Sequence, residues 1–341
     1  MKNRTKAFVL TTVIGLSILY FTYSNLGIVN VVETFKHFSL KRFLIYITAV
    51  TLIEIFLVIR WNTVLKAFKL KVPFHNLFLY KMSGYAVGYL SPQAHIGGEP
   101  VRALLLKRHN IKFKQGISSV LIDKSMQLTT DLLFAFVGAS ALFLHFSISR
   151  RIEFLIFGFI TAAISLLGFY FYCMIKKKPF FSAILSLRFL KKNNKLKKLR
   201  EDIIEVENTL HVFYVKHFNY FIRIIIINLF LYVLMFVEYS TAAMLFGFKP
   251  SIFTTLIVMG GVALSYSLPV PMALGVLEVS QISALGLLRQ NKAIGLSISL
   301  LVRMKDIIRT VIGSSALLYF GINKGLIWKQ IKGNKGKKNA K

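Results

Sequence analysis

Cysteine and the common ligand-binding motifs are nearly absent from this sequence. The one cysteine, Cys173, excludes an intramolecular disulfide framework. The seven histidines include no pair at ligand spacing near a carboxylate, so we expect neither a bound metal nor a cofactor. Neither G-x-x-x-x-G-K-S/T nor G-x-G-x-x-G occurs, so no nucleotide site is predicted. No serine and histidine have the spacing of a triad, and we assign no catalytic residue.

Acidic residues are also scarce, because 13 Asp and Glu accompany 44 Lys and Arg, for a formal net charge of +31. In a soluble protein this excess would indicate nucleic-acid binding. Here 55% of the residues are hydrophobic, the mean hydropathy is +0.61, and apolar runs of about twenty residues recur along the chain. The sequence therefore predicts an all-α integral membrane protein with no nucleic-acid partner. Its cations lie mostly in short loops, where they set orientation in the membrane.

One stretch of the chain occurs twice. A shift of 179 positions, with no gap, superposes residues 92–124 on 271–303 and places Glu99 on Glu278. Each copy reads proline, six residues, glutamate, twenty-four residues and a cation. An ionisable side chain inside a membrane costs about 2.5 kcal/mol or more unless it is paired or hydrated, so two such positions at one spacing indicate function.

A short apolar helix precedes each copy, and a second one begins within it. Residues 77–90 are followed by a break at proline, and a second helix begins near Glu99. Two helices of about fourteen residues, each about 21 Å long, are too short to cross about 30 Å of hydrocarbon. We therefore predict one re-entrant hairpin here and a second at about 253–288. The predicted hinges are Pro92, Gly97, Gly98, Pro269, Pro271 and Gly275.

About six full spans complete a predicted membrane domain of residues 1–323, followed by a lysine-rich tail, 324–341. The first repeat covers about 43–146 and the second about 221–322, joined by a basic loop, 176–216, that is either a cytoplasmic linker or carries a surface helix at 196–212. The spans are expected at about 7–24, 43–61, 116–145, 152–175, 221–246 and 293–320.

The distribution of cations predicts the orientation. Of the 44 Lys and Arg, 31 fall in the predicted cytoplasmic segments and 8 in the outer ones, which favours two cytoplasmic termini. The two hairpins then enter from opposite sides of the membrane. The architecture is an inverted repeat, which is typical of transporters with a site near the midplane.

The charged residues of the two copies are the candidate site. A lysine or arginine could hold a phosphate, and the glutamates could receive a cationic or hydroxylated headgroup or a proton. Alternatively, static ion pairs could pin each hairpin to the span that follows it. Asp123, Asp131, Glu54 and Glu238 carry less weight, and His95 is interpreted as a polar loop residue. The candidate substrate-binding residues are Glu99, Arg102, Lys124, Glu278, Arg303 and Asp306.

The blocks PQAHIGGEPVR, LPVPMALGVLE and LLVRMKDIIRTVIG resemble the lysylphosphatidylglycerol synthase transmembrane family, which is also described as flippase-like. The resemblance covers roughly residues 5–320. It implies a lipid flippase domain that moves aminoacylated phosphatidylglycerol to the outer leaflet. Asp123-Lys124 stands where a Glu-Arg pair is commoner in the family, so this site keeps its charges but has no guanidinium fork.

Three functions follow from these observations. The first is a lipid translocase for aminoacylated phosphatidylglycerol or another anionic or isoprenoid lipid, in a bacterial plasma membrane, with membrane phospholipids as partners. The second is a phosphatidylglycerol lysyltransferase that uses lysyl-tRNA and is linked to resistance to cationic antimicrobial peptides. Because a lysine-rich tail follows the last span, we expect no synthase domain and favour translocation. The third is a non-transporting assembly partner that docks through 176–216. A homo-oligomer is left open.

Overall fold

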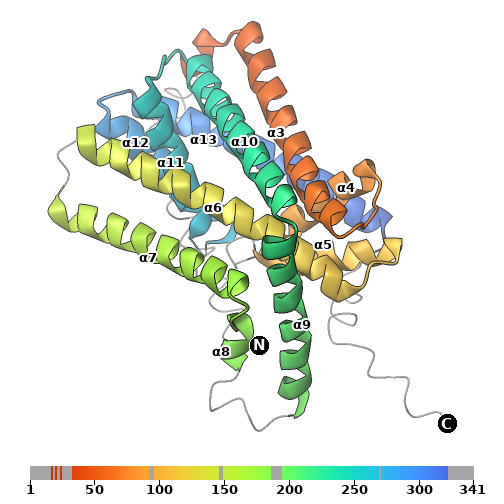
Figure 1. The fold of residues 1–341 in the computed structure, drawn as a ribbon. Helices are drawn as coiled ribbons and strands as arrows, with labels where there is room; N and C mark the ends of the chain where they lie inside the picture. Colours follow the sequence, from red (N-terminus) through yellow and green to blue (C-terminus); the bar gives the residue numbers. More distant parts are fainter. Residues whose placement is uncertain are drawn as a thin grey trace.

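The computed structural model describes residues 33–91, 96–145, 149–185, 194–268 and 270–321, together with Ser17, Tyr20 and Ser24. These residues form helices and no strands, which confirms the predicted all-α fold (Figure 1). The long helices are α3 (Leu40–Ala67), α6 (Phe113–His145), α7 (Arg150–Ile175), α9 (Asn194–Lys216), α10 (Phe218–Leu245) and α13 (Lys292–Tyr319). The shorter ones are α4 (Phe74–Tyr89), α5 (Glu99–Leu105), α8 (Phe181–Leu185), α11 (Ile252–Ser267) and α12 (Val276–Leu287).

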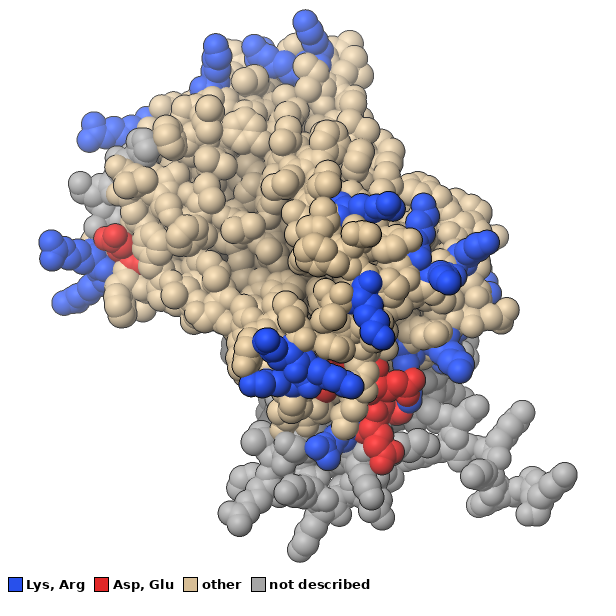
Figure 2. Space-filling view, in the orientation of Figure 1, with Lys and Arg blue, Asp and Glu red and all other residues tan. Residues whose placement is uncertain are grey.

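Four of the described helices, α3, α6, α7 and α10, are long and apolar enough to cross a membrane. Large apolar side chains on them face outward: Leu44 is 57% exposed, Phe154 78% and Ile226 60%, as expected for a surface covered by lipid. Figure 2 shows a broad uncharged surface with Lys and Arg gathered at its edges. The 28-residue helix α13 is similarly long but carries five charged residues. Apart from Ser17, Tyr20 and Ser24, the predicted first span lies outside the described residues, and so does the tail.

The 179-residue shift extends well beyond the duplicated stretch. It carries α3, α4 and α6 onto α10, α11 and α13 with starting positions that agree within one residue, and it places α5 inside α12. The packing is reciprocal, since α4 packs on α13 while α11 packs on α6, and α5 packs on α6 while α12 packs on α13. The helices α3 and α10 pack against each other and run antiparallel in Figure 1. Each half of the bundle therefore completes the other.

Glycines allow the crossings between the two halves. A Cβ on Gly313 of α13 would lie 2.0 Å from the backbone oxygen of Met82 in α4. A Cβ on Gly138 of α6 would lie 2.6 Å from the backbone oxygen of Leu256 in α11. Small residues let membrane helices approach closely, so these contacts fix the short helices against the long ones.

The hairpins differ in part from their predicted form. The second helix of the first hairpin is α5, which has seven residues and continues as a 3-10 helix, Leu106–His109, so the expected fourteen-residue helix is wrong. It ends because Asn110 adopts a left-handed conformation, with φ of 58°, which asparagine tolerates. In the second hairpin a 3-10 turn, Pro271–Ala273, precedes Gly275, whose φ of 75° favours glycine.

The predicted hinge glycine Gly98 serves a spatial purpose. Its φ of −84° is ordinary, but a Cβ there would lie 1.8 Å from the backbone oxygen of Gly84 in α4. Two glycines therefore bring the start of α5 against α4. The predicted hinges Pro92 and Pro269 lie outside the described residues.

The basic loop contains a helix that spans the predicted 196–212. Helix α9 has 23 residues and packs against α6, α7 and α10. Lys114 at the start of α6 pairs with Asp202 of α9 at 2.7 Å. The carboxylate of Glu207 accepts hydrogen bonds from the backbone N–H groups of Phe180 and Ser182 at 2.9 and 3.0 Å, which fastens α8 to α9.

Candidate functional site

The carboxylate of Asp123 is the centre of one buried charge cluster. It lies on α6 with no exposed surface, and it accepts hydrogen bonds from Arg102 at 2.6 Å and from Arg60 of α3 at 2.8 Å. The ammonium of Lys81, on α4, lies 3.5 Å away. Three elements of the first half therefore meet at one carboxylate, which offsets the cost of burying their charges.

Glu99 extends this cluster at the start of α5. Its carboxylate lies 3.0 Å from Arg102 and 3.7 Å from Lys124 of α6. The guanidinium of Arg102 also stacks on Trp61, 4.1 Å from the ring centroid. The first predicted acid and cation pair is therefore present as a buried ion pair.

The second copy holds the equivalent pair in a tighter form. The guanidinium of Arg303 on α13 makes two contacts with the Glu278 carboxylate, of 2.8 and 3.0 Å. It also donates to the backbone oxygens of Met272 and Ala273, the latter at 2.9 Å, and to the hydroxyl of Tyr89 at 3.2 Å. The planar guanidinium of arginine has enough N–H donors to make all of these contacts, which anchor the second hairpin to α13 and to α4.

A third set of charges lies one and two turns further along α13. Lys305 pairs with Glu238 of α10. Arg309 pairs with Glu54 of α3, and its guanidinium lies 3.6 Å from Asp306. These pairs tie α13 to both members of the central α3 and α10 pair.

Asp306 itself joins the two hairpins. Its carboxylate accepts a hydrogen bond of 2.6 Å from the hydroxyl of Tyr85 on α4 and another from Tyr266 on α11. The equivalent position in the first half is Gln127. Among the described residues, this carboxylate junction therefore has no counterpart at the equivalent position of the first half.

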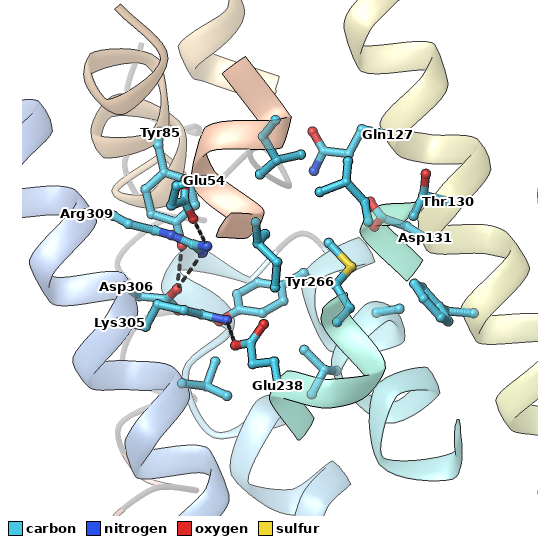
Figure 3. A pocket seen from close by; sticks show the side chains of 18 of the residues that line it. Glu54, Tyr85, Gln127, Thr130, Asp131, Glu238, Tyr266, Lys305, Asp306 and Arg309 are labelled. Atoms are coloured by element: carbon cyan, nitrogen blue, oxygen red, sulfur yellow. Dashed lines mark hydrogen bonds and ion pairs between the residues drawn. The ribbon is translucent and has the colours of Figure 1, made fainter. Parts of the chain in front are cut away.

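These clusters surround a cavity of about 350 Å³. In Figure 3, Asp306 and Arg309 project from α13 toward one side of it, and Gln127 and Asp131 from α6 line the other. Polar and apolar side chains of α3, α4, α10 and α11 complete the wall, and Phe134 of α6 also lines it. The charged residues among those lining it are Glu54, Arg60, Lys81, Lys124, Asp131, Glu238, Lys305, Asp306 and Arg309.

The predicted site residues divide into two groups. Lys124 and Asp306 line the cavity. Four others stand behind its wall, in the ion pairs that hold the hairpins: Glu99, Arg102, Glu278 and Arg303. Among the described residues, no group of three or more His, Cys, Asp or Glu side chains is placed to hold a metal ion, and His95 falls outside them.

Sequence reasoning left four cavity-lining cations out of the candidate set, Arg60, Lys81, Lys305 and Arg309. It gave four acids too little weight: Glu54, Asp123, Asp131 and Glu238. Arg60 and Lys81 were counted with the cytoplasmic loops because each stands at the edge of an apolar run. Glu54 and Glu238 were set aside because their superposition needs a gap. The missed signal is the scarcity of acidic residues, because seven of the 13 lie in predicted apolar segments, where each needs a cation.

Comparison with known proteins identifies the family. A family model described as "Lysylphosphatidylglycerol synthase TM region" matches residues 8–313. A UPF0104 membrane protein of Methanothermobacter thermautotrophicus is 28% identical over 95 residues. That alignment spans 28% of this chain and 28% of the relative.

Proposed function

The chain belongs to the family of lysylphosphatidylglycerol synthase TM regions, integral membrane proteins of lipid metabolism or transport, and we propose that it is a lipid translocase. Its substrate is a phospholipid with an anionic or aminoacylated headgroup, or an isoprenoid phosphate. The headgroup passes through the charged cavity while the acyl chains stay in the bilayer.

One observation carries this proposal: a cavity inside an apolar bundle is lined by charged residues from both halves of the chain. Burying so many charges is costly, and a protein that needed stability alone would gain as much from apolar packing. Pairing keeps the charges tolerable when the cavity is empty. A polar headgroup that enters exchanges some of these pairs for its own contacts.

An inverted repeat explains how one site could serve both leaflets. Passing from α3 through α6 and α7 to α10 changes direction at each helix, so α3 and its equivalent α10 cross the membrane in opposite senses. The two hairpins then enter from opposite sides, and the cavity lies between them near the midplane. Arg60, Lys81 and Arg102 lie inside the bundle rather than in loops, but the remaining excess of cations still favours two cytoplasmic termini in a bacterial plasma membrane.

The direct test is a transport assay with the purified protein in vesicles that contain a fluorescent phospholipid. A reductant added outside removes the label of the outer leaflet, and translocation exposes the rest. We expect the protein to accelerate this second phase and the double variant Glu99→Gln, Glu278→Gln to abolish the gain. The exposed substitution Glu201→Gln is the matched control.

The proposal is contradicted if the protein does not accelerate the translocation of any anionic, aminoacylated or isoprenoid-phosphate lipid. Formation of lysyl lipid from lysyl-tRNA and phosphatidylglycerol would instead support the lysyltransferase alternative. If neither activity occurs, a role as a membrane assembly partner takes its place.

A further inference from the structure

Positive charge is in excess in the first charge cluster. Four cations, two from α3 and α4 and two from α5 and α6, share the carboxylates of Asp123 and Glu99. Asp131, further along α6, lines the same cavity and interacts electrostatically with Lys124 and Arg60, so it belongs to this cluster. With Asp131 counted, four cations share three carboxylates, and the nearby Glu54 is already paired with Arg309, so one positive charge is in excess. Buried charges are normally balanced, and a bound anion would balance this one. The four cations are Arg60, Lys81, Arg102 and Lys124.

Three of these cations line the cavity and have donors to spare. The ammonium of Lys81 lies 3.5 Å from Asp123 and 3.3 Å from the backbone oxygen of Leu57. The ammonium of Lys124 lies 3.7 Å from Glu99 and donates to Gln127 at 3.4 Å. These contacts are longer than ordinary charge-assisted hydrogen bonds of about 2.7–2.9 Å.

Arg60 provides the second observation. It is 1% exposed and lines the cavity, and its Nε and Nη1 atoms donate to Asp123 and Asn228 at 2.8 and 3.0 Å. Its Nη2 atom is buried and has no hydrogen-bond partner among the described residues. A buried guanidinium nitrogen without an acceptor calls for a ligand, because it has lost its hydration.

The second half of the chain does not repeat this arrangement. The 179-residue shift places Tyr239 at the position of Arg60 and Gly260 at that of Lys81. The equivalent of Lys124 is Arg303, whose guanidinium already contacts Glu278 and two backbone oxygens. An anion would therefore bind at one place in the chain.

The cavity also reaches the outer surface of the bundle on an apolar side. Leu128 and Ser267 line it and are exposed, and Phe134, Met259 and Val262 line its interior. Its volume of about 350 Å³ is near the lower end of the range for small-molecule sites, about 300–1,000 Å³, so it suits a headgroup but not two acyl chains. The opening beside the exposed Leu128 would leave the acyl chains of such a ligand outside the cavity.

We infer that Arg60, Lys81 and Lys124 form one phosphate-binding subsite that holds the phosphodiester of an anionic lipid headgroup. The identification of the ligand as a lipid rests on the proposed function, whereas the binding of a phosphate group rests on these three side chains alone. Arg60 donates through its unpartnered nitrogen and the two lysines through their ammonium groups.

Binding of a short-chain lipid to the full-length protein in detergent tests the subsite. The ligand is dihexanoyl phosphatidylglycerol, with dihexanoylglycerol as the phosphate-free comparison and inorganic phosphate as the chain-free one. The variants are Lys81→Met and Lys124→Met, because each leaves its carboxylate paired with an arginine and preserves the fold. Lys112→Met, at an exposed position, is the matched control.

We expect each of the two variants to weaken phosphatidylglycerol binding about tenfold or more, as expected for losing one charge-assisted hydrogen bond, with Lys112→Met unchanged. Wild-type protein should bind dihexanoylglycerol and inorganic phosphate more weakly than the phospholipid. Equal affinity in all variants overturns the subsite, and equal affinity for inorganic phosphate and the lipid overturns its assignment to a lipid. Lysine-dependent binding without transport would leave the subsite standing and refute translocation.

Discussion

Tyr85 donates a hydrogen bond of 2.6 Å to Asp306 although 221 positions separate them in the chain. Tyr266, from the other half, donates to the same carboxylate. Two short helices are therefore held together through one side chain of α13.

The first prediction concerns that junction. A carboxylate can accept both tyrosine hydroxyls, whereas an amide offers one oxygen acceptor, so Asp306→Asn should lose one of the two bonds. We expect the vesicle transport rate to fall about tenfold, since a hydrogen bond to a charged group contributes about 1.5–3 kcal/mol. Tyr85→Phe should reproduce much of the loss, and the exposed Glu201→Gln should not. An unchanged rate in Asp306→Asn would show that the junction is only structural.

A second prediction distinguishes the two arginines that contact Asp123 from the more distant Lys81. Asp123→Asn leaves Arg60 and Arg102 without their shared carboxylate, and breaking a buried ion pair by removing one partner costs about 3–5 kcal/mol. We expect a marked fall in the temperature of thermal unfolding in detergent. Lys81→Met should unfold near the wild-type temperature because its contact is the longest of the three. Similar losses in both variants would contradict this ranking.

A third prediction tests the crossing of the two halves. Gly313→Ala places a methyl group against the backbone of Met82, and overpacking of this kind costs about 1–3 kcal/mol. The unfolding temperature should fall. Gly158→Ala on α7 is the control, because a Cβ there meets no atom within 4 Å, and it should leave stability unchanged or slightly higher. Equal behaviour of the two variants would mean that α4 and α13 can separate freely.

A fourth prediction uses a histidine outside the spanning helices. Burial, together with His75 and Arg108, lowers the pKa of His109 below its ordinary value of 6.5. The unfolded chain therefore binds the proton more tightly, so this part of the stability is present above pH 6.5 and is lost as the pH falls through the lower folded value. His109→Gln should flatten the decrease in unfolding temperature on acidification. A decrease as steep as in the wild type would exclude His109 as its source.

Much of the fold follows from periodicity and length. The apolar runs predicted helices, and the superposition of Glu99 on Glu278 predicted two related ion pairs, both of which are present. The amphipathic pattern of α9 was also visible in the sequence. The short length of α5 was not, because the chain changes to a 3-10 helix after Leu105, and that helix ends at the left-handed Asn110.

The sequence by itself determined that the chain is helical, apolar and duplicated, because these properties depend on residue type and spacing along the chain. Only the tertiary structure decided which charges share a cavity. Lys81, Asp123 and Arg60 meet through the packing of α3, α4 and α6, and their distances depend on helix crossings that no local pattern encodes. The same packing moved Glu99 and Glu278 behind the cavity wall, since the cations that pair with them also anchor the hairpins.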